Sequence, residues 1–310
     1  QARMERRELL VRDGTRMRRL SYLHWTPAVR RQGPVTVVLC MHGLTRCARD
    51  FEYVGARLAE AGVEAASLDA AGRGCSDWLD AAAAYCYATY VADAAAVGAH
   101  LQACAGGARL LALGTSMGGL VAMHLAALAA PGGGPWLARV ALNDIGPRVP
   151  AAALRRLAAY VGREPVPFPS AAAAEAHLRR TLAPFGPLTD AQWAFLADAS
   201  TAPCAGGLRM HYDPAIAAAF APSDAAPADY DVSDVWRAMQ PGTRVMLVRG
   251  AESDIVPPSV VEQMRAEGPG LAAYLEVPGV GHAPALLDAA QVDPVLAFLL
   301  ADDDAPAPAQ

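Results

Sequence analysis

The sequence of 310 residues predicts an α/β fold in which helices cover both faces of a mostly parallel sheet. Between residues 35 and 144, short apolar runs typical of buried strands alternate with helical stretches. The alternation stops between residues 147 and 229, where proline-broken helical segments predominate, and then resumes. Hydrophobic residues make up 54% of the chain, which is ample for one large core.

The first half of the chain predicts a hairpin and then four strands, each of the first three followed by a helix. The hairpin is indicated by two alternating runs joined at Asp13-Gly14. Asp50 and Gly62 are the expected start and end of the first helix. The strands are expected at residues 35–41, 63–70, 108–116 and 138–144, and the helices at residues 50–62, 84–104 and 117–130.

Residues 147–229 contain no convincing buried strand, and a helical cap inserted into the core explains them better than a second domain. Residues 1–146 and 230–302 then form the core, which ends with two strand-helix pairs. The strands are TRVMLVRG and AAYLEVPG, and the helices are PSVVEQMRAEG and a stretch from about residue 290 to 300. The acidic, proline-rich residues 303–310 are expected to be disordered.

Composition excludes several classes of protein. A formal net charge of -5 without a basic stripe argues against a nucleic-acid partner. Apolar runs are too short for membrane insertion, and no signal peptide is recognisable. The six cysteines form no CxxC pair, which favours free thiols in a reducing, cytoplasmic compartment and argues against a metal site. The sequence leaves open whether the chain forms a homo-oligomer.

Ser116 is the expected nucleophile of an enzyme. It lies in Gly114-Thr115-Ser116-Met117-Gly118, between a predicted strand and a predicted helix. A nucleophile elbow requires this context, because the backbone is strained there and side chains at the flanking glycines would collide with neighbouring chain. An ordinary strand-to-helix turn is the alternative for the five residues taken alone.

A serine hydroxyl needs a base to accept its proton and an acid to orient that base. His282 follows the last predicted strand and is the expected base. Asp254 follows the strand before it, and we favour Asp254 as the acid. Asp144, at the end of another strand, is the alternative. Loops after parallel strands share one sheet edge, so these residues can converge.

The backbone N–H groups of Leu44 and Met117 are expected to form an oxyanion hole, because they follow a strand end and the nucleophile. His42 is expected to brace its loop. Arg46 is a candidate for contact with an anionic group of the substrate, and loop bracing is the equal alternative. Loop bracing is favoured for Arg73.

The stretches HGLTR (42–46), DAAGRGCSDW (69–78), GTSMGG (114–119), RGAESDIVP (249–257) and GVGHAP (279–284) resemble the serine-nucleophile branch of the α/β-hydrolase fold family. The resemblance implies an eight-stranded sheet, a helical cap after strand six and a Ser-His-Asp triad. Many family members carry the acid at the position of Ser253, one residue before Asp254, and others carry it after strand six.

These residues predict a serine esterase that forms an acyl-enzyme on a small acyl substrate and requires no metal or cofactor. The same triad serves C–C bond hydrolases, lactonases and acyltransferases. A non-catalytic protein that binds a small ligand on this fold is the alternative from another class.

Overall fold

Eight strands form one sheet in the order β1-β2-β4-β3-β5-β6-β11-β12. The β1–β2 and β2–β4 pairs are antiparallel and the other pairs are parallel, which confirms the predicted fold class. The strands are β1 (Arg3–Asp13), β2 (Arg16–Thr26), β3 (Thr36–Met41), β4 (Glu64–Leu68), β5 (Arg109–Thr115), β6 (Leu137–Asn143), β11 (Arg244–Gly250) and β12 (Ala273–Val277).

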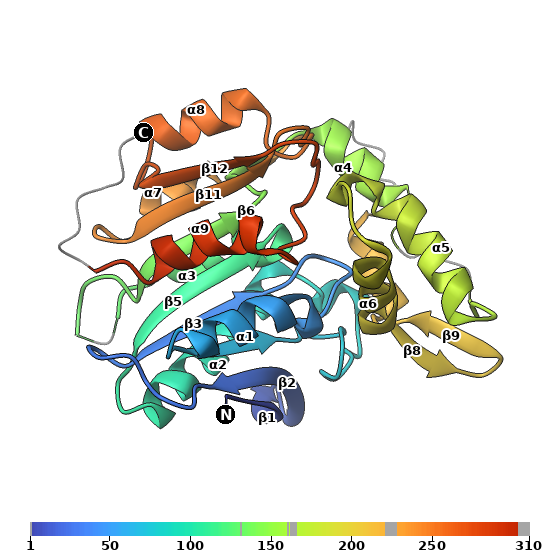
Figure 1. The fold of residues 1–310 in the computed structure, drawn as a ribbon, viewed down its shortest axis with the longest axis horizontal. Coiled ribbons are helices and arrows are strands. Elements are labelled where there is room, and N and C mark those ends of the chain that lie inside the picture. The colour runs from blue at the N-terminus through green and yellow to red at the C-terminus, as the bar shows by residue number, and fades with distance from the viewer. Residues whose placement is uncertain (1, 131, 160, 162–165, 221–227, 303–310) are drawn as a thin grey trace.

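The computed structural model describes residues 2–130, 132–159, 161, 166–220 and 228–302 (Figure 1). The tail at residues 303–310, for which disorder was predicted, lies outside these residues. None of the helices in the described part of the chain combines the length and the hydropathy needed to cross a bilayer.

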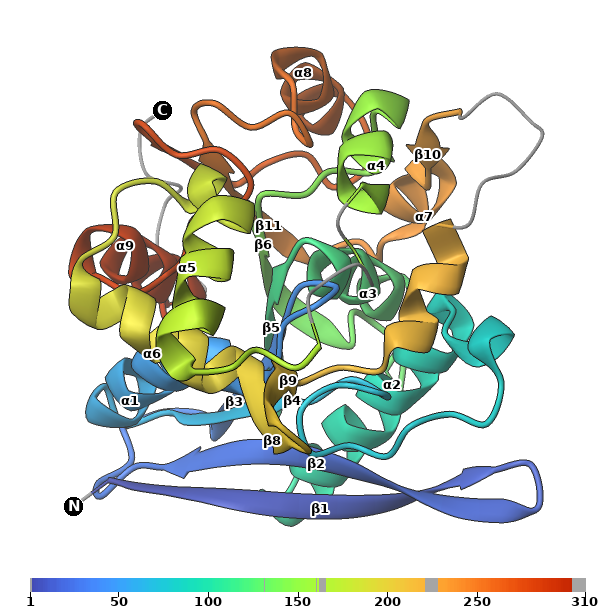
Figure 2. The ribbon, with the colours of Figure 1, turned by 90° about the vertical axis from the view of Figure 1, so that its right-hand side faces the viewer.

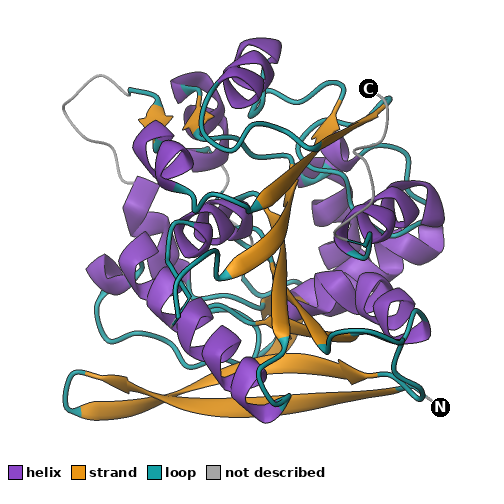
Figure 3. Ribbon diagram, turned by 90° about the vertical axis from the view of Figure 1, so that its left-hand side faces the viewer, coloured by secondary structure: helices purple, strands orange, loops and turns teal. Residues whose placement is uncertain are grey.

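Helices cover both faces of the sheet (Figure 3). Helices α1 (Glu52–Glu60) and α9 (Ala289–Leu299) pack on one face. The opposite face carries α2 (Tyr87–Cys104), α3 (Met117–Ala126), α7 (Ser233–Ala238) and α8 (Pro258–Ala266). Strand β3 is apolar throughout because both of its faces are buried. Val38 and Cys40 pack on the side of α1 and α9, and Val37 and Leu39 pack on the opposite side.

Asp50 does not cap the first helix as predicted. A 3-10 turn, η1 (Ala48–Phe51), precedes α1, and Phe51 stands at the cap position without a side-chain hydrogen bond. The Asp50 carboxylate binds the guanidinium of Arg46 instead. Two charge-assisted hydrogen bonds to a guanidinium are stronger than one hydrogen bond to a helix N–H, so Asp50 pairs with Arg46 and does not cap α1.

The described residues between β6 and α7 add no strand to the main sheet. They pack over the loops that follow the parallel strands: Pro184 O accepts from Gly281 N, and His211 O accepts from Gly74 N. Figure 2 shows this layer facing the viewer. Its elements are β7 (Arg148–Val149), α4 (Ala151–Ala158), α5 (Ala171–Thr181), η3 (Ala183–Phe185), α6 (Asp190–Ser200), β8 (Thr201–Cys204), β9 (Gly207–Met210), η4 (Pro214–Phe220) and β10 (Tyr230–Asp231).

The β8–β9 hairpin was not predicted. Each strand has only four residues, and most of them are partly exposed, so no buried apolar run marks either strand. Gly206 in the turn and Gly207, the first residue of β9, both have positive φ, as tight turns require.

Candidate active site

Ser116 lies between β5, which ends at Thr115, and α3, which begins at Met117. Its backbone has φ 52° and ψ −118°, a conformation that non-glycine residues seldom adopt. The Ser116 N–H donates to Asn143 O on the neighbouring β6, over 3.0 Å. The strained turn therefore projects the hydroxyl from the end of β5, with the amino terminus of α3 directly behind it.

The glycines around Ser116 are sterically required. A Cβ atom on Gly114 would lie 2.4 Å from the carbonyl oxygen of Gly118, and a Cβ on Gly118 would lie 2.1 Å from the carbonyl oxygen of Met41. Real Cβ atoms essentially never approach backbone so closely. The backbone of α3 thus passes directly against the ends of β3 and β5, which fixes the position of Ser116 between them.

Gly118→Ala is expected to destabilise the fold by about 2–3 kcal/mol, because α3 must move away from β3 to admit the methyl group. Thermal unfolding measures the loss. Gly132→Ala is the matched control, since a Cβ there meets nothing within 4 Å. The control should change stability by less than about 0.5 kcal/mol. Equal melting temperatures for Gly118→Ala and wild type would contradict the tight packing.

His282 follows β12 and contacts both other members of a hydrogen-bonded chain. Its Nε2 lies 2.8 Å from Ser116 Oγ, and its Nδ1 lies 2.8 Å from Asp144 Oδ2. The side chain of His282 is 9% exposed and that of Asp144 is fully buried. An ionised carboxylate only accepts hydrogen bonds, so Nδ1 carries the proton and Nε2 is free to accept from the serine hydroxyl.

Asp144 directly follows β6 and is held by two groups from the loop after β11. Its Oδ1 accepts from Gly250 N over 2.8 Å, and its Oδ2 accepts from Ser253 Oγ over 2.7 Å. Two backbone N–H groups, of Ile255 and Val256, donate in turn to Ser253 Oγ, so the serine hydrogen points to the carboxylate. This network fixes the carboxylate that faces His282.

The structure corrects the expectation that Asp254 contacts His282. The Asp254 carboxylate forms a two-bond ion pair with Arg156 of α4, at 2.6 and 2.8 Å. Partial burial alone would raise the pKa of Asp254, but the bonds and charge of Arg156 outweigh it and lower the pKa. Asp254 is one residue beyond Ser253, and that step turns its side chain away from His282 and toward α4.

The loop after β3 lies against Ser116, as the oxyanion hole requires. A Cβ on Gly43 would lie 3.8 Å from Ser116 Cβ, so the loop backbone passes close to the serine. Within the described residues, neither the Leu44 N–H nor the Met117 N–H donates to a protein acceptor. Both donors thus have no protein partner in that part of the chain, Leu44 following the glycine that approaches Ser116 and Met117 following Ser116 itself.

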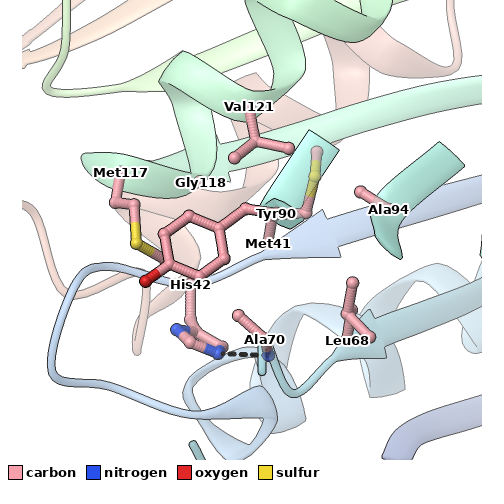
Figure 4. A pocket seen from close by; sticks show the side chains of 9 residues that line it. All are labelled: Met41, His42, Leu68, Ala70, Tyr90, Ala94, Met117, Gly118 and Val121. Atoms are coloured by element: carbon pink, nitrogen blue, oxygen red, sulfur yellow. Dashed lines mark hydrogen bonds between the residues drawn. The ribbon is translucent and has the colours of Figure 1, made fainter. Parts of the chain in front are cut away.

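His42 braces this loop, and burial lowers its pKa. Its Nδ1 lies 2.7 Å from Gly43 O, and its Nε2 accepts from Ala70 N over 3.0 Å, as the dashed line in Figure 4 shows. A neutral imidazole with the proton on Nδ1 satisfies both bonds. His42 also lines a small, mainly apolar cavity with Met41, Leu68, Ala70, Tyr90, Ala94, Met117, Gly118 and Val121 (Figure 4).

Arg46 joins the loop after β3 to η1 and α6. Its Nε and Nη2 donate to Asp50, and its Nη1 donates to Ser200 Oγ at the end of α6, over 2.5 Å. The side chain is 6% exposed. These bonds favour the bracing alternative over contact with an anionic substrate.

The chain is similar to known proteins over much of its length. The family model described as serine aminopeptidase, S33, matches residues 32–153, which include Ser116 and the loop after β3. A 3-hydroxybutyrate-oligomer hydrolase from Cupriavidus necator is 36% identical over 282 residues, which cover 89% of this chain and 91% of the relative.

Two solved structures share the fold over nearly the whole chain. An α/β hydrolase from Novosphingobium aromaticivorans is 29% identical with a TM-score of 0.77, covering 96% of this chain and 98% of its own. An esterase from Mycobacterium tuberculosis is 21% identical with a TM-score of 0.63, covering 95% and 92%, and this likeness concerns the fold alone. The chain is a hydrolase that belongs to the serine hydrolases of the α/β-hydrolase fold family.

Proposed function

We propose that the protein cleaves carboxylic esters through an acyl-enzyme on Ser116, with His282 as the base and Asp144 as the acid. The observation that carries this proposal is the unbroken chain of two 2.8 Å contacts from Ser116 Oγ through the imidazole to Asp144 Oδ2. A serine that only ended a strand would not need a base and a buried carboxylate aligned behind it.

In the proposed reaction, Ser116 Oγ attacks the ester carbonyl carbon while Nε2 of His282 takes the hydroxyl proton. Asp144 stabilises the imidazolium that forms, and the N–H groups of Leu44 and Met117 hold the negative oxygen. The imidazolium then protonates the leaving alcohol. Water activated by the same imidazole releases the acid and restores Ser116.

The relative from Cupriavidus necator suggests which esters to test first. Its name assigns it to oligomers of 3-hydroxybutyrate, whose units are joined by ester bonds. We therefore propose short esters of 3-hydroxy acids as the substrate class and expect the dimer and trimer of 3-hydroxybutyrate to be hydrolysed to the monomer.

Labelling with a small fluorophosphonate tests the proposal without any assumption about the substrate. Wild type should gain the mass of one phosphonyl group, and Ser116→Ala should gain none, because the reagent reacts with an activated serine beside an oxyanion hole. Ser67→Ala is the matched control, since Ser67 is a buried serine whose hydroxyl has no partner among the described residues. Labelling of Ser116→Ala, or none of folded wild type, would contradict the proposal.

A further inference from the structure

Arg73 lies in the glycine-rich loop after β4, and its side chain is completely buried. Its Nε donates to the carbonyl oxygen of Leu44 over 2.9 Å, and its Nη1 donates to Ala71 O over 2.8 Å. Its Nη2 lies 3.6 Å from the sulfur of Met117. The guanidinium therefore contacts both residues whose N–H groups form the proposed oxyanion hole.

No carboxylate of the described residues pairs directly with this charge, and the buried carboxylate of Asp213 is separated from it by the Tyr85 side chain, whose hydroxyl donates to Asp213. Within the described part of the chain, no Asp or Glu forms an ion pair or hydrogen bond with Arg73. The guanidinium lies instead over aromatic rings, with 4.7 Å to the centroid of Tyr90 and 5.8 Å to that of Tyr85. Two other buried arginines, Arg46 and Arg249, each pair with a carboxylate.

A buried cation without a paired anion is costly, because neither water nor a counter-charge stabilises it. Holding the loop after β3 in place does not require a buried charge, since a neutral side-chain amide could also donate to the Leu44 carbonyl oxygen. The position of the charge is what distinguishes Arg73. The guanidinium contacts the two residues that carry the N–H donors, through the Leu44 carbonyl oxygen and the Met117 sulfur, in an interior where charge is weakly screened.

We propose that Arg73 is a positioning residue of the oxyanion hole whose positive charge, not paired directly with a carboxylate, stabilises the negative oxygen formed when Ser116 attacks its substrate. This inference rests on the proposed function. The bond to Leu44 holds the loop after β3 in place, and the charge favours the anionic tetrahedral species over the neutral ester.

Arg73→Met tests the inference because it keeps the length and apolar packing of the side chain and removes the charge. The expected result is a fall in kcat of about 10- to 100-fold with KM changed less than about twofold. Affinity for a trifluoromethyl ketone, which forms an anionic tetrahedral adduct with Ser116, should fall by the same factor as kcat/KM. Affinity for the neutral product alcohol should not change.

Two further variants separate charge from shape. Arg73→Lys keeps the charge and should recover most of kcat. Arg73→Gln keeps an N–H donor for the Leu44 carbonyl but not the charge, so it should lose as much kcat as Arg73→Met. Arg73→Gln also keeps the inference testable if Arg73→Met fails to fold.

Arg139→Met is the matched control. Arg139 is equally buried, donates to the carbonyl oxygen of Phe298 over 3.1 Å and lies 5.6 Å from the centre of the Phe298 ring. Arg139 contacts Phe298 and Asp302, which lie far in sequence from the loop after β3 and from Ser116. Its replacement is expected to lower thermal stability while kcat stays within about twofold of wild type.

The inference is overturned if both neutral variants of Arg73 keep wild-type kcat. It is also overturned if Arg73→Met weakens the ketone and the alcohol equally, since that result describes a general distortion of the site. Fluorophosphonate labelling of the same samples distinguishes failure of the Arg73 inference from failure of the proposed function. Wild type that labels on Ser116 upholds the proposed function whatever Arg73 does, whereas wild type that fails to label removes the basis of both.

Discussion

Ser116→Ala is expected to lower kcat for ester hydrolysis about 10⁴- to 10⁶-fold, because no acyl-enzyme can form without the hydroxyl. His282→Ala should lose a similar factor, since Ser116 Oγ has no other base within reach: its hydrogen-bond partner in the described structure is His282 Nε2. The double variant should be hardly slower than either single one, because the two groups act as a unit. Initial rates with an activated ester measure all three.

Thermal unfolding provides the control for these variants. Ser116→Ala removes a single oxygen atom. His282→Ala removes a side chain that is 9% exposed and contacts Ser116 and Asp144, outside both hydrophobic clusters of the core. All three variants should unfold within a few degrees of wild type. Turnover by folded Ser116→Ala at more than about a hundredth of the wild-type rate would refute the assignment of the nucleophile.

Asp144→Asn is expected to lower kcat about 10⁴-fold, because an amide no longer favours the imidazole tautomer with its proton on Nδ1 and cannot stabilise the imidazolium. Asp254→Asn should change kcat less than about threefold, since Asp254 binds Arg156 and not His282. The two substitutions remove the same charge from neighbouring loops. They therefore form a matched pair, compared by kcat at one pH.

If Asp254→Asn lowered kcat far more than Asp144→Asn, Asp254 would be the acid, as the sequence alone favours. Thermal stability gives a second comparison. Asp254 and Arg156 are 46% and 34% exposed, so loss of their pair should cost less than about 1 kcal/mol. Asp144 is fully buried among three donors, and Asn can satisfy those donors only in part. Asp144→Asn should therefore be the less stable of the two variants.

Most of the fold could be predicted from the sequence, because parallel strands buried on both faces leave unmistakable apolar runs. Residues 35–41 show this, since all of Val37 to Met41 are buried in β3. Ser116 could be found because a strained turn needs glycines at fixed positions, and Gly114 and Gly118 are indeed packed against backbone. Such constraints are local in sequence.

The acid could not be chosen from the sequence because the choice depends on side-chain direction. Asp144 and Asp254 both follow strands that lie side by side in the sheet. Which carboxylate reaches the imidazole is decided by loop geometry and by Arg156, 98 residues away from Asp254 in the chain. That Arg73 has no directly paired carboxylate among the described residues could not be predicted from the sequence either, since it depends on how distant parts of the chain are arranged around the guanidinium.

The ion pair between Asp254 and Arg156 has a consequence for how such an enzyme can diversify. Because the carboxylate facing His282 comes from the end of β6, Asp254 is released to join the loop after β11 to helix α4. Mutations at this junction can alter how the layer between β6 and α7 sits without touching the groups next to Ser116. Selection for new substrates can therefore act on that layer while the chemistry at Ser116 is inherited unchanged.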